Sequence, residues 1–395
     1  MTLQIEEPSQ TQSFSLFKLG FRPFFFLAAV FATLLISVWL SQLNGLFSTS
    51  HYYGSVGWHA HEMLFGYTVA VIAGFLLTAV GNWTGIKMIS GWRLVLLSLV
   101  FILGRVSPFI SILPGWLIAA VDIVFIPLLA LIIALPILRA KQWSNLIFIP
   151  LLLMMAVANL LVHLSVLDIL FVSVVTGSRV MMYLVILLIV IMGGRVIPFF
   201  TEKGVKDANI KKWHWIEILS PISIILLGTA DVMYGDIPLT GYCALIAATI
   251  HSIRLAGWFS KNILQVPLVW VLHIAYAWFI VGFIIKSLLL LNMNESVFSY
   301  HAFTVGGIGI MTLGMMARVS LGHTGREMKV NRIVVFAFIL INFAAMIRVI
   351  APIFSPNNYL QLVGISGYLW IITFAIFLVI YTPMLISSRV DGREG

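Results

Sequence analysis

Residues 58–85, WHAHEMLFGYTVAVIAGFLLTAVGNWTG, decide the fold of this protein. The stretch opens with His59, His61 and Glu62 and then runs for about 20 residues without a charged side chain, the length that a helix needs to cross a bilayer. Ionisable side chains are costly within the bilayer and usually face a protein interior there. The stretch therefore predicts a membrane-spanning helix with candidate functional residues at one end.

Apolar runs of similar length recur along the whole chain. Of its 395 residues, 61% are hydrophobic and only 9% are charged, and the mean hydropathy is +1.08, which leaves too little polar surface for a water-soluble domain. We therefore predict an all-α, polytopic membrane protein with about twelve transmembrane helices and the lipid bilayer as its solvent. The predicted spans lie near residues 21–40, 58–80, 92–110, 116–138, 145–165, 170–197, 213–234, 238–257, 264–290, 299–320, 332–352 and 360–383.

The distribution of positive charge predicts the orientation of the chain. All but four of the 23 lysines and arginines fall on or near the cytoplasmic side if the N-terminus is cytoplasmic, as positive-inside topology requires. This topology explains the net charge of +9, so we expect no nucleic-acid partner. The sequence predicts a cytoplasmic N-terminal tail, a single membrane domain and a cytoplasmic C-terminal tail, at residues 1–17, 18–386 and 387–395.

Two pairs of segments predict an internal repeat. Residues 61–85 align without a gap with residues 301–325, which pairs His61 with His301, and residues 145–158 align in the same way with residues 262–275. The implied unit is four helices, repeated three times. Chance similarity between apolar segments is the alternative.

Histidine is the residue on which any redox metal must depend. The single cysteine, Cys243, excludes a CxxCH haem attachment, a four-cysteine iron–sulfur cluster and a two-cysteine copper site. Four histidines are predicted near the outer ends of spans, at a shared depth: His59, His61, His163 and His301. Since copper and haem iron both bind neutral imidazole, we expect metal ligation within this group, with a merely interfacial position as the alternative.

The first turn of the span at residues 58–80 can serve two sites. Residues two apart on a helix point to nearly opposite faces, so His59 and His61 are expected to have different neighbours. Glu62 is expected on the face of His59, where it could hydrogen-bond the imidazole or relay protons; a favourable carboxylate at a helix N-terminus is the alternative. His273 lies deeper in its span, as a further candidate ligand or a hydrogen-bonded packing residue.

Three arginines share the outer half of the bilayer with these histidines. Arginine pairs well with carboxylates, and a haem carries two propionates. We therefore expect some of these arginines to anchor propionates, with pairing to Asp122 or Asp168 as the alternative. The three residues are Arg105, Arg179 and Arg348.

Four long motifs resemble the NnrS family. They are GFRPFFF at residues 20–26, WHAHEMLFGY at 58–67, GGRVIPFFT at 193–201 and HAFTVGGIGIMTLGMMARVSLGHTGRE at 301–327. The resemblance implies a bacterial inner-membrane protein of nitric-oxide metabolism and resistance to nitrosative stress, containing haem and copper.

A twelve-helix body in three units also resembles the catalytic subunit of haem-copper oxidases and nitric-oxide reductases. That likeness implies His61 and His301 as the axial ligands of one haem, and leaves His59, His163 and His273 for a second haem or a copper ion. The chain lacks the adjacent histidine pair and the HPE motif of that superfamily, which puts a conventional copper centre in doubt.

The expected function is that of a redox protein with haem b that binds nitric oxide and reduces it. Its electrons would come from a quinol or a partner redox protein, and Glu62 is the candidate proton relay. One alternative is a scavenger or sensor that binds nitric oxide or iron–nitrosyl species without turnover. A secondary transporter is another, because twelve helices with internal repeats also suit that class.

Overall fold

The computed structural model describes residues 14–46, 52–291 and 296–393, and these residues form helices and turns without a strand. Twelve helical stretches are long and apolar enough to cross a membrane, which confirms the predicted fold class. They are Phe21–Leu43, Ser55–Thr84, Trp92–Phe109, Gly115–Arg139, Trp143–Val166, Val174–Gly204, His214–Tyr234, Pro238–Trp258, Pro267–Leu291, Val297–His323, Arg332–Phe354 and Pro356–Ile386.

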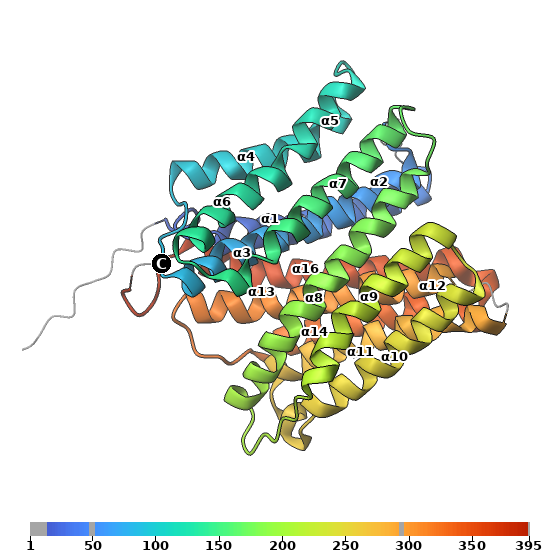
Figure 1. Cartoon of the computed structure of the whole chain (residues 1–395). Helices are drawn as coiled ribbons and strands as arrows, with labels where there is room; N and C mark the ends of the chain where they lie inside the picture. Colours follow the sequence, from blue (N-terminus) through green and yellow to red (C-terminus); the bar gives the residue numbers. More distant parts are fainter. Residues whose placement is uncertain (1–13, 47–51, 292–295, 394–395) are drawn as a thin grey trace, which may run out of the picture.

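Several of these spans consist of more than one helical element, as labelled in Figure 1. The α-helices are α1 (Phe21–Leu43), α2 (Ser55–His61), α3 (Val69–Thr84), α4 (Trp92–Val106), α5 (Gly115–Ile123), α6 (Phe125–Arg139), α7 (Phe148–Val166), α8 (Val174–Gly204), α9 (His214–Tyr234), α10 (Pro238–Trp258), α11 (Pro267–Ser287), α12 (Ser296–His301), α13 (Ile310–His323), α14 (Arg332–Val349), α15 (Ala351–Phe354) and α16 (Tyr359–Ile386). Two π-helical segments, η1 (Glu62–Thr68) and η6 (Ala302–Gly309), join α2 to α3 and α12 to α13.

The sixth span is longer than predicted. The sequence placed its end at residue 197, before Pro198, but α8 continues through that proline to Gly204. Proline lacks a backbone N–H and normally disturbs a helix, yet membrane helices tolerate it because neighbouring groups satisfy the freed carbonyl. The polar residues Glu202 and Lys203 then extend the helix beyond its apolar part.

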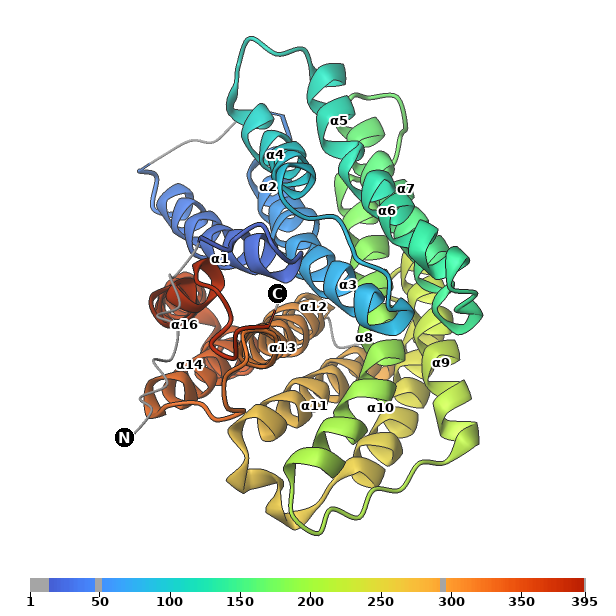
Figure 2. The same cartoon turned by 90° about the vertical axis from the view of Figure 1, so that its left-hand side faces the viewer.

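Four spans form the centre of the bundle. The most apolar window of Ser55–Thr84 is 89% buried within the protein, and those of the sixth, ninth and tenth spans are 72–78% buried, against 33–50% for the other eight. In Figure 2, α3, α8, α11 and α13 belong to these four spans, and α4, α5 and α16 lie toward the outside of the bundle. Side chains on the central spans are therefore surrounded by protein, and polar groups there must find partners on neighbouring helices.

The two aligned segments share an uncommon local structure. A π-helical segment follows His61 directly, and another follows His301 directly. The aligned stretches 61–85 and 301–325 also each end at a glycine with positive φ, Gly85 at 68° and Gly325 at 76°. This likeness covers one pair of spans, and the four-helix unit repeated three times stays a prediction.

The start of α1 and the end of α16 meet at one end of the bundle. Arg22 donates hydrogen bonds to the carbonyls of Leu385 and Ser387, 2.8 and 2.7 Å away, and so closes the C-terminus of α16 against α1. Of the two predicted tails, residues 1–13 and 394–395 lie outside the described residues. The cytoplasmic placement of both tails stays a prediction.

Candidate metal centre

Four spans place polar side chains at one point near the end of the bundle opposite the chain termini. Helix α2 ends at His61, and η1 begins with Glu62. Helix α4 carries Arg105 in its last turn. Between α5 and α6 the helix is interrupted, because the ring of Pro127 conflicts with the carbonyl of the residue four before it, and Asp122 lies at this break.

Helix α7 completes the group with two residues on one face. Asn159 and His163 are four residues apart, so their side chains point the same way. Each carries a side chain that is at most 1% exposed, and so does His61. Burial of this many polar groups in a membrane helix bundle indicates a functional site rather than a solvated surface.

Two imidazoles and one carboxylate converge in this group. One ligand atom from each of His61, Asp122 and His163 lies within 4.8 Å of the other two. Asp122 Oδ2 is 3.2 Å from His61 Nε2 and 2.9 Å from His163 Nε2. Two histidines and one carboxylate that leave further positions open are a donor set typical of non-haem iron.

Each imidazole is oriented through its second nitrogen. Glu62 Oε1 lies 3.0 Å from His61 Nδ1, and the hydroxyl oxygen of Tyr52 lies 2.8 Å from His163 Nδ1. With Nε2 of each imidazole free to bind a metal, each Nδ1–H donates to the oxygen beside it. Metal-binding histidines usually have such a partner on the nitrogen that faces away from the metal.

Several polar groups surround His61 Nε2. Asn159 donates its amide N–H to Asp122 Oδ2 at 2.9 Å, which turns its own Oδ1 toward His61 Nε2, 3.0 Å away. A neutral imidazole has one N–H and one lone pair, so Nδ1–H can donate to Glu62 while Nε2 accepts from the hydroxyl of Tyr53, 3.3 Å away. With this tautomer, Nε2 is also the atom that could bind a metal ion beside the carboxylate of Asp122.

Arg105 balances part of the negative charge. Its guanidinium forms a close ion pair with Asp122 and approaches Glu62 Oε1 to 3.2 Å. For Arg105 the structure thus shows the carboxylate pairing that the sequence left as the alternative to propionate binding. With two carboxylates and one guanidinium, the group keeps one excess negative charge when His61 is neutral, which favours a bound cation.

Glu62 lies beside His61 in the structure, and its predicted place beside His59 is wrong. The sequence placed it on the face of His59, but its carboxylate contacts His61. The backbone at His61 and Glu62 is α-helical, so it is the Glu62 side chain that reaches the neighbouring imidazole, at 3.0 Å from Nδ1. Glu62 Oε2 is buried without a hydrogen-bond partner among the described residues, which fits a group that can accept a proton.

His59 and His61 face different sides of α2, as the sequence predicted. The His59 ring stacks on Trp39 of α1, with ring centroids 4.4 Å apart, and lies in the neighbourhood of Arg348 and His301. Arg348 of α14 donates from Nη2 to His301 Nε2 at 2.9 Å. We call this group the His59–His301 site.

Two buried atoms of the His59–His301 site have no hydrogen-bond partner among the described residues. They are His59 Nδ1 and Arg348 Nη1. Imidazole is the usual axial ligand of haem b, and a guanidinium suits a carboxylate such as a haem propionate. His59 Nδ1 and Arg348 Nη1 would suit such a group, whereas both nitrogens of His301 already have partners, Val297 O and Arg348.

The structure does not bring the predicted haem ligands His61 and His301 together. Both nitrogens of His61 face partners from its own group, and His301 Nε2 faces Arg348. Their ligation of a common haem stays a prediction.

Two other candidate residues lie apart from both sites. His273 Nδ1 lies 3.0 Å from Val269 O and its Nε2 lies 3.3 Å from Trp258 O, so the imidazole can donate its N–H to a backbone carbonyl, in line with the packing role given as the alternative. Arg179 lies over the ring of Tyr300, 5.2 Å from its centroid. Its assignment to a propionate stays a prediction.

Sequence reasoning missed Asp122 as a ligand and missed the supporting residues Tyr52 and Asn159. Asp122 was considered only as a partner for arginine. Two features of the sequence could have indicated these residues. Asp122 is an acidic side chain within an apolar span, and Asn159 lies one helical turn before His163. The tyrosine lies before α2 and carried no such signal.

A comparison with protein families agrees with the motifs. The family model described as NnrS protein matches residues 15–389, nearly the whole chain. This protein belongs to the NnrS family. No curated protein matches the sequence.

Membership of the NnrS family links this protein generally to the response to nitric oxide. The family match spans every residue of the His61–Asp122–His163 group and of the His59–His301 site. The family resemblance expected from the sequence is confirmed, while the cofactor content implied by it stays a prediction.

One substitution tests how closely the site is packed. A Cβ atom on Gly104 would lie 2.7 Å from Asp122 Oδ1 and 3.3 Å from its Cα, so Gly104→Ala must displace Asp122. Loss of a residue that only orients a metal ligand typically weakens metal binding by about 10- to 100-fold, and displacement of the candidate ligand Asp122 should weaken it at least as much. We expect a loss of this size in a metal titration of the purified protein.

Gly364→Ala is the matched control, because a Cβ atom there meets nothing within 4 Å. It should bind metal like the unaltered protein. Equal metal affinity in Gly104→Ala would show that the contact with Asp122 does not hold the site in shape.

Proposed function

We propose that this NnrS-family protein is a redox protein that binds nitric oxide at a metal ion held by His61, Asp122 and His163, and reduces it. The observation that carries the proposal is the convergence of these three side chains, all buried, with their ligand atoms within 4.8 Å of one another. We choose nitric oxide as the substrate because the family is linked to the response to nitric oxide.

The protein's own residues have separate roles in this proposal. Glu62 and Tyr52 hold the two imidazoles in position through their Nδ1 atoms. Arg105 holds Asp122 and compensates its charge. A redox-active ion on this donor set would supply an electron and an open position for a small ligand.

The reaction needs protons and electrons as well as a binding site. Two molecules of nitric oxide, two electrons and two protons give one nitrous oxide and one water. Glu62 is suited to pass a proton, because it contacts His61 and its second oxygen is buried without a partner among the described residues. We propose that haem b at the His59–His301 site carries the electrons. A quinol or a partner redox protein would donate these electrons to the haem.

The two sites can be tested separately by an absorption spectrum and elemental analysis of purified variants. We expect His61→Ala to lose non-haem metal and nitric-oxide consumption while keeping the haem spectrum. His301→Ala should lose or alter the haem spectrum. The exposed His214 provides the control, and His214→Ala should retain both.

The outcome also separates the rival functions. Nitric-oxide binding without formation of nitrous oxide under a reductant would establish a scavenger or sensor. Wild-type protein without metal or haem under metal-replete expression would overturn the proposal, and substrate flux in vesicles would then favour a transporter.

A further inference from the structure

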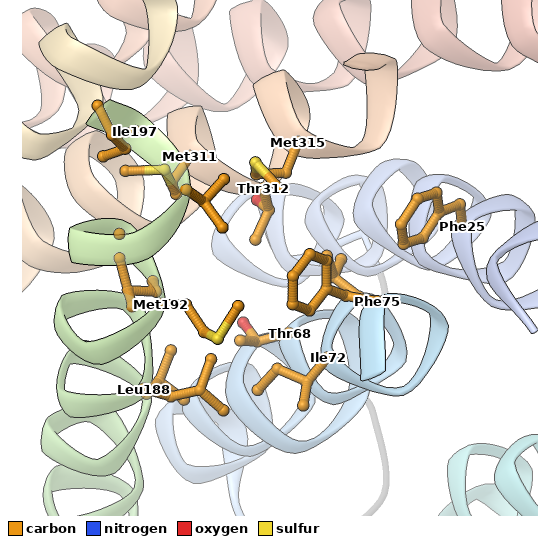
Figure 3. Close-up of a pocket in the computed structure, with 15 residues that line it drawn as sticks. Phe25, Thr68, Ile72, Phe75, Leu188, Met192, Ile197, Met311, Thr312 and Met315 are labelled. Carbon is orange, nitrogen blue, oxygen red and sulfur yellow. The ribbon is translucent and has the colours of Figure 1, made fainter. Parts of the chain in front are cut away.

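An apolar cavity of about 70 Å³ lies among the central helices, between η1 and α3, α8 and α13, with Phe25 of α1 completing its wall (Figure 3). Twelve of its fifteen lining residues are buried. The three that are half-buried, Phe75, Val196 and Met315, lie toward the end of the bundle that holds the chain termini. The cavity is thus lined mainly by buried side chains, and it is partly open rather than fully enclosed.

The cavity offers little to a water molecule. Only Thr68 and Thr312 among its lining residues have polar side chains. Thr68 donates its hydroxyl proton to Met63 O at 2.8 Å, and Thr312 donates to Ile308 O at 2.7 Å. A buried water needs two to four polar partners, and cavities lined by aliphatic and aromatic groups stay dry and accept apolar guests such as xenon.

The cavity lies close to the metal centre along the same span. Thr68, at the end of η1, follows His61 by seven residues, which corresponds to roughly 10 Å along a helix axis. The π-helical segment joins the two places, and such segments are frequent at functional sites.

We propose that this cavity is a binding site for a small, weakly polar gas molecule, and that it holds nitric oxide near the metal centre. The identity of the gas rests on the proposed function. Nitric oxide is uncharged and diatomic, so it can enter an apolar space that excludes ions and gives water no hydrogen bonds. A site of this kind raises the local concentration of the gas beside the group that binds it.

Gly193 offers a way to fill the cavity without disturbing the bundle. It lines the cavity, and a Cβ atom added there meets Ile197 and Tyr276 only at ordinary distances of 3.4–4.0 Å. A leucine at this position would therefore place its side chain in the cavity. Gly364→Leu is the matched control, since Gly364 is also helical and its Cβ would enter open space.

Xenon binding to the full-length protein in lipid nanodiscs, measured by ¹²⁹Xe NMR, tests the cavity itself. We expect a saturable site in the wild type and in Gly364→Leu, and binding at least about tenfold weaker in Gly193→Leu, a loss of about 1.4 kcal/mol. Anomalous scattering from xenon-pressurised crystals should place the atom among Ile72, Leu188 and Met311. If Gly193→Leu does not fold, Ile72→Phe fills the same space.

The absence of a saturable xenon site would overturn the proposal. An unchanged xenon affinity in a folded variant with a filled cavity would also overturn it. The same holds if a lipid tail or an ordered water occupies the cavity and xenon does not displace it.

The rate of nitric-oxide binding to metal-loaded protein after flash photolysis tests the link to function. Gly193→Leu should slow binding at least about threefold at unchanged metal content. An unchanged rate would overturn the role in holding nitric oxide. A protein that binds xenon but contains no metal would refute the proposed function while leaving the cavity as a gas site.

Discussion

Asp122→Asn is expected to remove the metal ion and to destabilise the protein by about 3–5 kcal/mol, because it takes the charge from a buried carboxylate that pairs with a buried guanidinium. Asp122 contacts both candidate imidazole ligands, and its side chain is 2% exposed. The amide keeps the shape of the carboxylate, so the effect reports on charge. Elemental analysis and unfolding in detergent micelles measure the two losses.

Asp168→Asn is the control for this experiment. Asp168 is exposed in the loop after α7, and its positive φ of 56° is one that asparagine also tolerates. We expect it to change neither metal content nor stability. Full metal occupancy in Asp122→Asn would refute the assignment of this carboxylate as a ligand.

Lys286→Met is expected to destabilise the protein by a similar amount, about 3–5 kcal/mol, without affecting the metal centre. Lys286 Nζ lies 2.6 Å from Asp231 Oδ1, and both side chains are fully buried. Removal of the ammonium leaves the carboxylate of Asp231 buried beside two tyrosine hydroxyls, with its main counter-charge gone. Unfolding in micelles, with metal content as a second readout, measures the effect.

Two further variants show whether the loss comes from an uncompensated buried charge. Lys286→Met combined with Asp231→Asn should regain most of the lost stability, because neither charge then remains. Lys329→Met removes an exposed pair with Glu327 and should cost about 0–1 kcal/mol. Equal losses in Lys286→Met and Lys329→Met would contradict this explanation.

The sequence was sufficient for the features that depend on local composition. Twelve spans could be predicted because an apolar run of sufficient length must become a helix in lipid, whatever its neighbours are. The opposite directions of His59 and His61 followed from the angular step of the α-helix alone. The family followed from long contiguous motifs, which need no knowledge of packing.

The partners of each polar side chain were decided only by the tertiary structure. Asp122 and His163 meet His61 from two different spans, and which helices become neighbours depends on packing between distant parts of the chain. Glu62 contacts the adjacent His61 rather than His59, a choice of partner that angular positions on an ideal helix do not show. Helix formation in a membrane is determined within a segment, whereas a metal site requires several segments to meet. The sequence therefore indicated the candidate histidines but not the residues that contact them.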